Sequence, residues 1–234
     1  MKPQHKPLAG HRVVSGIAFI VLLAAFVLFL LVGLSLPIVK AVYLLSFQAT
    51  TIRDPPTSIA TELRFGVWGV CATSDLNQPT LLGNTGVCYG PQLGYTIPSY
   101  ITALAPTISD QVVRAAQRSL LVILVLHPIA AALSFLTLVS ALFLASHTFA
   151  IFTLILAIIT SIVGSIVLGI DLALVIVAQG EVSKLQNFDF EVLFGNGIWM
   201  IVVAVALTWL AVVVLSARTC YCCGVRKHHY HHHH

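Results

Sequence analysis

The sequence predicts an all-α membrane protein in which four transmembrane helices form a bundle beneath a small, disulfide-stapled extracellular β-sheet. Of the 234 residues, 58% are hydrophobic and only 9% are charged, whereas soluble domains carry about 25% charged residues. Four apolar runs reach the length of about 20 residues that a helix needs to cross the hydrocarbon core. The one long polar stretch contains two cysteines, Cys71 and Cys88.

The four apolar runs set the predicted boundaries of the chain. None of them contains Lys or Arg, and only the third contains a carboxylate, Asp171. The first run is too long for the apolar part of a signal peptide, so we expect it to be retained. The predicted segments are an amino-terminal tail (1–12), a first span (13–36), a first loop (37–118), a second span (119–145), a tight turn (146–148), a third span (149–178), a second loop (179–196), a fourth span (197–217) and a carboxy-terminal tail (218–234).

Charge sets the predicted orientation. Both tails contain basic residues and no acid. Short basic flanks stay in the cytoplasm, so we expect both termini inside and both loops outside. The net charge of +4 is therefore explained by topology, and no nucleic-acid partner is predicted. The basic residues of the tails are Lys2, Lys6, Arg12, Arg218, Arg226 and Lys227.

The cysteines divide between the two sides of the membrane. Cys71 and Cys88 lie on the predicted oxidising side, where a disulfide between them would contribute about 3 kcal/mol in the chain-entropy model. Cys220, Cys222 and Cys223 follow the fourth span on the cytoplasmic side, which makes them candidate S-palmitoylation sites. A zinc site with the nearby histidines is the less favoured alternative because the ligands are too crowded, so no metal is predicted.

The first loop contains the predicted sheet. Residues rich in β-favouring side chains predict one strand over 41–47 and a central strand over 61–71, and a return strand begins at 87–89. The disulfide would join the central strand to the return strand. A short helix over 108–119 leads into the second span.

Asp171 is the main anomaly of the spans. A carboxylate inside a span costs roughly 2.5–3.5 kcal/mol on insertion scales, and such residues usually face partners or cavities. At 1.5 Å per residue, Asp171 lies ~10 Å below the outer end of its span, and His127 lies ~12 Å below the same surface. We hypothesise a hydrogen bond between them whose protonation responds to external pH. The alternative is that Asp171 is protonated or contacts water near the interface.

Small residues and one tryptophan each have two interpretations. Ser161, Ser165 and Gly169 recur every four positions, a stripe that favours packing inside the bundle over a dimer face. For Trp68, packing where the sheet meets the bundle is favoured over binding to a partner or to lipid headgroups. Gly66 and Gly69 would let the strand bulge or approach the bundle closely.

Several motifs resemble the fungal PalI, or pali-domain, family of pH-response regulators and eisosome-type cortical proteins. The first-loop signature of that family looks like Gly66-Val67-Trp68-Gly69-Val70-Cys71, followed by Gly86-Val87-Cys88 and Leu93-Gly94-Tyr95. The segment Gly195-Asn196-Gly197-Ile198-Trp199 fits the start of its fourth span. The cysteine-loop pattern is also similar to that of claudins and of fungal mating-fusion proteins. Claudins carry a second tryptophan ahead of the motif, which this loop lacks.

The resemblance implies a claudin-like fold, with a left-handed four-helix bundle beneath a small antiparallel extracellular sheet. It also implies three roles without choosing among them. These are ambient-pH sensing as an accessory subunit, organisation of cortical membrane domains, and support for membrane fusion and calcium entry.

The residues themselves do not predict catalysis. The sequence has no nucleophile with its base, no metal-ligand spacing and no phosphate loop on one side of the membrane. The spans offer few polar residues to line a pathway, which disfavours a channel or transporter. We therefore predict a non-enzymatic, claudin-like tetraspan protein of the plasma membrane that acts as a scaffold or as an accessory subunit of a larger complex.

The predicted partners are membrane lipids and either a larger integral membrane protein or further copies of the chain. No cofactor is predicted beyond a bound lipid or sterol. The alternative function is a pH-sensing signalling subunit, or a regulator of ion entry or membrane fusion, working through Asp171 and His127.

Overall fold

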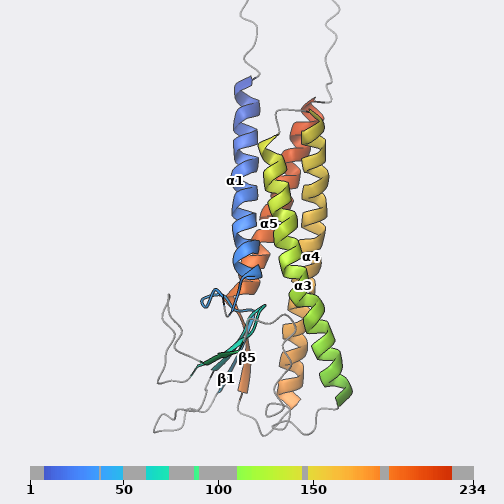
Figure 1. Cartoon of the computed structure of the whole chain (residues 1–234). Helices are drawn as coiled ribbons and strands as arrows, with labels where there is room; N and C mark the ends of the chain where they lie inside the picture. Colours follow the sequence, from blue (N-terminus) through green and yellow to red (C-terminus); the bar gives the residue numbers. More distant parts are fainter. Residues whose placement is uncertain are drawn as a thin grey trace, which may run out of the picture.

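In the residues that it describes, the computed structural model contains four long helices and a five-stranded sheet. Figure 1 shows the helices running side by side, with the sheet at one end of the bundle. The fold class predicted from the sequence is therefore confirmed, including the disulfide between Cys71 and Cys88. The structure describes residues 8–36, 38–49, 62–73, 87–89, 110–143, 147–184 and 190–222.

The four helices are long and apolar enough to cross a membrane. Within the bundle, α1 and α4 each pack against both α3 and α5. The first turn of α1 and the last turn of α5 lie at the same end of the bundle, opposite the sheet (Figure 1). The helices are α1 (Leu8–Gly33), α3 (Asp110–Leu142), α4 (His147–Lys184) and α5 (Asn196–Cys222).

Small side chains and hydroxyl groups bring the helices together in the bundle core. A Cβ atom on Gly164 of α4 would lie only 2.9 Å from the Phe29 ring of α1, so the glycine permits this close approach. Between α3 and α4, the hydroxyl oxygens of Thr137 and Thr160 are 3.0 Å apart and form a hydrogen bond. Such contacts suit helix packing in lipid, where burial of apolar side chains does not distinguish a neighbouring helix from the bilayer.

The outer ends of α3 and α4 extend beyond the predicted spans. The predicted helix over 108–119 is no separate element, because α3 runs without a break from Asp110. At 1.5 Å per residue, the 38 residues of α4 measure about 57 Å, whereas the hydrocarbon core is about 30 Å thick. On the sheet side, α3 and α4 project past α1 and α5 (Figure 1). The outer part of the molecule therefore consists of two helical extensions beside a sheet.

The sheet combines strands from both loops between the helices. Its strand order is β4-β3-β2-β1-β5, and every neighbouring pair is antiparallel. Because β1 lies between β2 and β5, and β5 belongs to the second loop, β1 joins the two loops in one sheet. The strands are β1 (Leu45–Ala49), β2 (Glu62–Phe65), β3 (Val70–Thr73), β4 (Val87–Tyr89) and β5 (Phe190–Phe194).

The predicted central strand over 61–71 is wrong as a single strand. The chain turns after β2, where the Gly66 amide donates a hydrogen bond to the Gly69 carbonyl oxygen at 2.9 Å, and then returns as β3. The alternating pattern continues across this turn, which explains the error. The strand β5 was not predicted, although Phe190, Val192 and Phe194 alternate with other residues as a half-buried strand requires.

One face of the sheet rests on α4 near Val175. Val175 of α4 packs in a buried cluster with Leu45 of β1, Val192 of β5 and Ile198 of α5. Next to this cluster, the Gln179 side-chain amide donates a hydrogen bond to the Val192 carbonyl oxygen at 3.0 Å. The cluster contains residues from the sheet, from α4 and from the start of α5, so these three parts form one packed unit.

Candidate functional site

The residues Gly66–Gly69, here called the signature turn, fasten the sheet to the end of α1. The Trp68 amide donates to the Leu36 carbonyl oxygen at 3.0 Å, and the Val67 amide donates to the Ser35 hydroxyl oxygen at 2.8 Å. Ser35, Leu36 and Val67 are buried. These backbone groups must be satisfied inside the protein because water does not reach them. The turn is therefore fixed by directional bonds as well as by packing.

Gly66 brings the signature turn into backbone contact with the chain that follows α1. A Cβ atom at this position would lie 2.5 Å from the Leu36 Cβ atom and 2.7 Å from the Leu36 nitrogen. Both distances are shorter than real contacts of a Cβ atom. The close approach expected for Gly66 from the sequence is thus present, and any side chain there would push the sheet away from the bundle.

Trp68 connects the signature turn directly to α1. Its indole Nε1–H donates a hydrogen bond of 2.6 Å to the carbonyl oxygen of Gly33, the last residue of that helix. Carbonyl groups in the last turn of a helix lack partners within the helix, so the indole satisfies one of them. The polar group of Trp68 is therefore engaged inside the molecule, as the packing interpretation requires.

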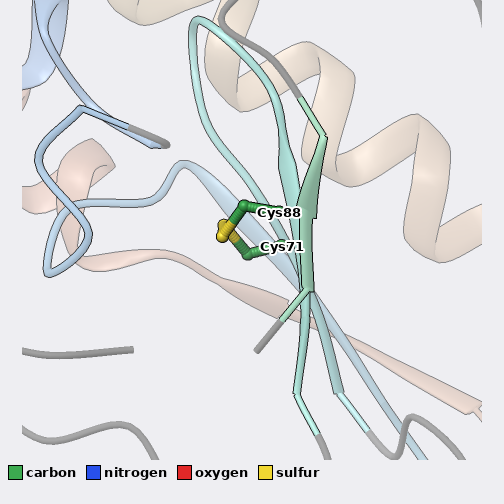
Figure 2. Close-up of a disulfide and its surroundings, with 2 residues drawn as sticks. All are labelled: Cys71 and Cys88. Atoms are coloured by element: carbon green, nitrogen blue, oxygen red, sulfur yellow. A yellow bond between two sulfur atoms is a disulfide. The ribbon is translucent and has the colours of Figure 1, made fainter. Parts of the chain in front are cut away.

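The disulfide closes the far side of the sheet. Cys71 of β3 lies directly opposite Cys88 of β4, and Figure 2 shows the bond joining the two strands. Cys71 is fully buried, so the β3 side of the bond is shielded from solvent. Two other residues of the predicted signature, Gly94 and Tyr95, lie outside the described residues.

A second attachment joins the sheet to the start of α5, and sequence reasoning did not identify it as a site. The Asn196 side chain accepts a hydrogen bond from the Tyr43 amide at 3.0 Å and donates one to the Ala41 carbonyl oxygen at 2.6 Å. The Gly195 amide donates to the Leu44 carbonyl oxygen at 2.9 Å. A Cβ atom on Gly195 would overlap the Tyr43 carbonyl oxygen. The Gly195-Asn196-Gly197 triplet is the signal that could have revealed this attachment.

His127 of α3 and Asp171 of α4 meet inside the bundle. The His127 Nε2 and Asp171 Oδ2 atoms are 3.2 Å apart, and the two side chains are only 2% and 3% exposed. The sequence analysis hypothesised this pair, and the structure brings the two residues together. A buried ion or hydrogen-bonded pair is strongly destabilised when one partner is removed, because the other is left alone in a low dielectric.

The depth of this pair differs from the sequence estimate. Gly33 at the end of α1 approaches the His127 carbonyl group, since a Cβ atom on Gly33 would lie 3.7 Å from that oxygen. The pair therefore lies level with the outer end of α1. It is also about 13 residues, or ~20 Å, from the end of α4 at Lys184, because that helix continues past the predicted span.

Gly33 links the two parts of the site. Its carbonyl oxygen accepts the Trp68 indole N–H, and its backbone packs against the carbonyl group of His127. Gly33 therefore lies between the buried pair and the signature turn and is next to both.

The remaining predicted residues are divided between the bundle and its surface. Ser161 is buried, and the Ser165 hydroxyl oxygen accepts a hydrogen bond of 3.2 Å from the Trp209 indole N–H of α5. Gly169 instead faces open space, with no atom within 4 Å of the position that a Cβ atom would take. The predicted small-residue stripe thus serves the bundle at its first two members only.

The carboxy-terminal cysteine cluster lies at the other end of the protein. The backbone of Cys220 and Cys222 belongs to the last turn of α5, at the end of the bundle opposite the sheet (Figure 1). The side chains of Cys220 and Cys222 and the whole of Cys223 lie outside the described residues. S-palmitoylation of the cluster stays a prediction.

Comparison with known protein families identifies the chain. A comparison with individual characterised proteins gives no significant match. The sequence model of the SUR7/PalI family matches residues 14–217, which include the membrane-spanning parts of all four helices, the disulfide and both attachments of the sheet. This four-span protein therefore belongs to the SUR7/PalI family.

Proposed function

We propose that this chain is a non-enzymatic plasma-membrane protein that acts as a scaffold or accessory subunit by presenting its sheet to a larger membrane protein. The observation that carries this proposal is the double attachment of the sheet. The signature turn binds the sheet to α1, and Asn196 binds it to α5, in each case through hydrogen bonds between a side chain and the backbone. A sheet held in one orientation is suited to recognition, because little conformational freedom is lost when a partner binds.

The face of the sheet turned away from α4 is the proposed contact surface. Gln48, Glu191 and Leu193 are exposed or half-exposed there, while the opposite face packs on Val175. On the same face, the Arg64 guanidinium makes two hydrogen bonds to the Glu62 carboxylate, at 2.8 and 3.0 Å, and stacks 4.8 Å from the centre of the Tyr43 ring. A fixed arrangement of charged, polar and apolar groups suits a specific protein partner better than lipid.

Gentle-detergent purification from native membranes tests this function. The full chain should retain one stoichiometric larger membrane protein, identified by mass spectrometry and size analysis. A variant with Glu191→Lys and Leu193→Asp should lose that protein while keeping its own thermal stability, because both side chains are exposed. Val213→Leu, exposed on α5 far from the sheet, is the matched control and should retain the partner.

The alternatives give different results in the same experiment. Recovery only as assemblies of the chain itself would replace the accessory role with that of a scaffold. Recovery of a lone monomer from native membranes would contradict both roles. Retention of the partner by the Glu191→Lys, Leu193→Asp variant would show that the sheet face is not the contact surface.

A second candidate function, pH sensing in a signalling complex, is favoured by the position of His127 and Asp171. Histidine changes its charge between about pH 5 and 8, and this one touches Asp171 at the outer end of the bundle. Through Gly33, the pair is connected to the signature turn. Other ionisable side chains described on the outer side are Lys40, Tyr43, Glu62, Arg64 and Glu191.

Thermal unfolding of the full chain in lipid nanodiscs, measured across about pH 5 to 8, tests the second candidate. Asp171→Asn should reduce the pH dependence of the unfolding temperature, since the histidine would lose the carboxyl group that it touches. Glu191→Gln, which alters an exposed carboxylate of the sheet, should leave that dependence in place. An unchanged pH dependence in Asp171→Asn would contradict the sensing role.

A further inference from the structure

The charged residues are divided unequally along the chain. All carboxylates lie between residues 54 and 191, so none belongs to α1, to α5 or to either tail. Half of the 12 basic residues, by contrast, lie at or before residue 12 or at or after residue 218. The chain that enters α1 and the chain that leaves α5 therefore carry positive charge with no carboxylate to offset it. These basic residues are Lys2, Lys6, Arg12, Arg218, Arg226 and Lys227.

Two of these residues belong to helices that pack against each other. Arg12 is part of α1 and Arg218 is part of α5. Ala18 of α1 and Leu215 of α5 lie in one buried cluster. Because the two helices are antiparallel, Arg12 lies about 9 Å beyond Ala18 and Arg218 about 5 Å beyond Leu215 in the same direction. The backbones of both arginines therefore lie at similar heights at the end of the bundle opposite the sheet (Figure 1).

This height corresponds to that of lipid headgroups. Trp199 is 66% exposed near the start of α5, and tryptophan there is typical of the aromatic belt at one membrane surface. Arg218 follows 19 residues later, which is about 29 Å along the helix. The hydrocarbon core is about 30 Å thick, and each headgroup layer adds about 5–8 Å. The Arg218 backbone therefore lies where the hydrocarbon ends and the opposite headgroup layer begins.

The positive-inside rule alone does not explain the missing carboxylates. That rule counts Lys and Arg, whereas Asp and Glu contribute little to it. Acids in the first turn stabilise a helix, but α1 and α4, which begin at the end opposite the sheet, have none there. The helix α3, which begins at the sheet end, starts with Asp110. Carboxylates are therefore missing from positions where helix stability would favour them, as a site for anions requires.

We propose that the adjoining ends of α1 and α5 bind the headgroups of anionic phospholipids in the membrane leaflet that meets them. Guanidinium groups form paired hydrogen bonds with phosphate and stay charged at physiological pH. The N–H groups in the first turn of α1 add a field that favours an anion. Residues 143–146, which join α3 to α4, contain no Lys or Arg, so the site belongs to the α1–α5 side of the bundle.

Lipid retention by the full chain tests this site. The protein in mild detergent is mixed with equal amounts of phosphatidylcholine, phosphatidylserine and phosphatidylinositol bisphosphate and analysed by native mass spectrometry. The bisphosphate should be retained most and phosphatidylcholine least. Each Lys or Arg near a membrane surface strengthens the attraction of anionic lipid by about five-fold. The variant with Arg12→Gln and Arg218→Gln should therefore retain anionic lipid, relative to phosphatidylcholine, about 5- to 25-fold less.

Two further variants separate the effect of charge from that of the fold. The variant with Lys40→Gln and Lys184→Gln loses two positive charges from the sheet end and should keep the lipid preference of the unaltered chain. The variant with Arg12→Lys and Arg218→Lys keeps both charges and should keep most of the preference. Equal unfolding temperatures in detergent confirm that all variants share one fold.

Salt tests the site without any substitution. Raising the ionic strength should weaken the preference for anionic lipid, because charges exposed to solvent are screened. Inorganic phosphate should displace no more lipid than chloride does at the same ionic strength. Greater displacement by phosphate would assign the arginines to free phosphate and overturn the lipid site. Equal retention of the three lipids, or an equal loss in the Lys40→Gln, Lys184→Gln variant, would also overturn it.

The lipid site and the proposed partner of the sheet lie at opposite ends of the molecule and fail separately. A chain that prefers anionic lipid but retains no larger protein would contradict only the accessory role. A chain that retains its partner but binds all three lipids equally would contradict only the lipid site.

Discussion

Where the sheet meets the bundle, individual residues permit the contact because they are small or because they donate one hydrogen bond. Gly66 and Gly195 each let a backbone pass where a Cβ atom would overlap another chain segment. Trp68 donates its one polar side-chain hydrogen to the end of α1. Because the neighbours of both glycines include backbone atoms, they cannot move aside as a flexible side chain could. The identity of these residues is therefore set by packing distance.

Gly66→Ala should destabilise the protein by at least about 1–3 kcal/mol, the usual cost of forcing an extra methyl group into a packed interior. The added Cβ atom would overlap Leu36, so the sheet must separate from α1. Thermal unfolding in detergent, followed by the fluorescence of Trp68 and the other tryptophans, measures the effect. Gly16→Ala, which places its methyl group in open space on α1, should be neutral or stabilising.

Removing one member of the buried pair should cost more than replacing both. Asp171→Leu or His127→Leu alone should each destabilise by about 3–5 kcal/mol, because the remaining polar group loses this contact inside the bundle. The double replacement should cost clearly less than the sum of the two. A double-mutant cycle on thermal or denaturant unfolding measures this coupling. Strict additivity of the two substitutions would show that the 3.2 Å contact contributes nothing.

At the scale of elements, the sheet is too small to be stable without its attachments. Its strands contain three to five residues each, and isolated small sheets are marginal in water. The disulfide holds β4 against β3, the signature turn holds β2 and β3 against α1, and β5 packs on α4. The edge strand farthest from α4 is therefore the one that is held covalently.

Reduction of the disulfide should loosen β4 and leave the helices intact. The two cysteines are separated by 17 residues, and a loop of that size corresponds to about 3 kcal/mol of stabilisation in the chain-entropy model. The double substitution Cys71→Ser and Cys88→Ser should therefore speed hydrogen exchange and proteolysis in β3 and β4. Helical circular dichroism should stay unchanged. Cys222→Ser is the control, and equal proteolysis of the two variants would contradict the role of the bond.

Some parts of the fold were predicted from the sequence and others were not. The two groups differ in how far apart along the chain the interacting residues lie. The number of helices followed from length and hydropathy alone, because each span makes its backbone hydrogen bonds within its own helix. The break at Gly66–Gly69 escaped because alternation looks the same on both sides of a turn. The strand β5 escaped because its partner, β1, lies about 145 residues away.

The contact between His127 and Asp171 was predictable for a simpler reason. Both helices continue beyond their predicted ends, so each depth was estimated from a point inside the helix. Relative heights on antiparallel neighbours survive such errors, whereas absolute depth in the membrane does not. The attachment at Asn196 required knowledge of where residues 41–44 lie, and no local pattern supplies that.

For the whole molecule, the structure separates two ends of different chemistry. The sheet and the helical extensions occupy one end, and the first turn of α1 and last turn of α5 occupy the other (Figure 1). Combined with the basic tails, this arrangement predicts that the sheet is extracellular and that both termini are cytoplasmic. Every contact proposed for the sheet depends on that orientation.

Labelling of intact cells with a membrane-impermeant thiol reagent checks the orientation. Gln48→Cys, exposed on β1, should react in intact cells, because the sheet is expected to face outward. The cytoplasmic cysteines should react only after the membrane is permeabilised, unless they are acylated. Labelling of the Gln48→Cys variant only after permeabilisation would reverse the predicted topology.

The place of β1 between β2 and β5 constrains how the protein is made. The ribosome delivers β1 long before β5, and at about 5–20 residues per second the intervening ~145 residues take about 7 to 30 s. During that interval the nascent chain carries a strand with one unpaired edge, the kind of edge that recruits other chains. The half-synthesised protein is therefore the form most dependent on a chaperone, and truncations before residue 190 should be prone to aggregation and degradation.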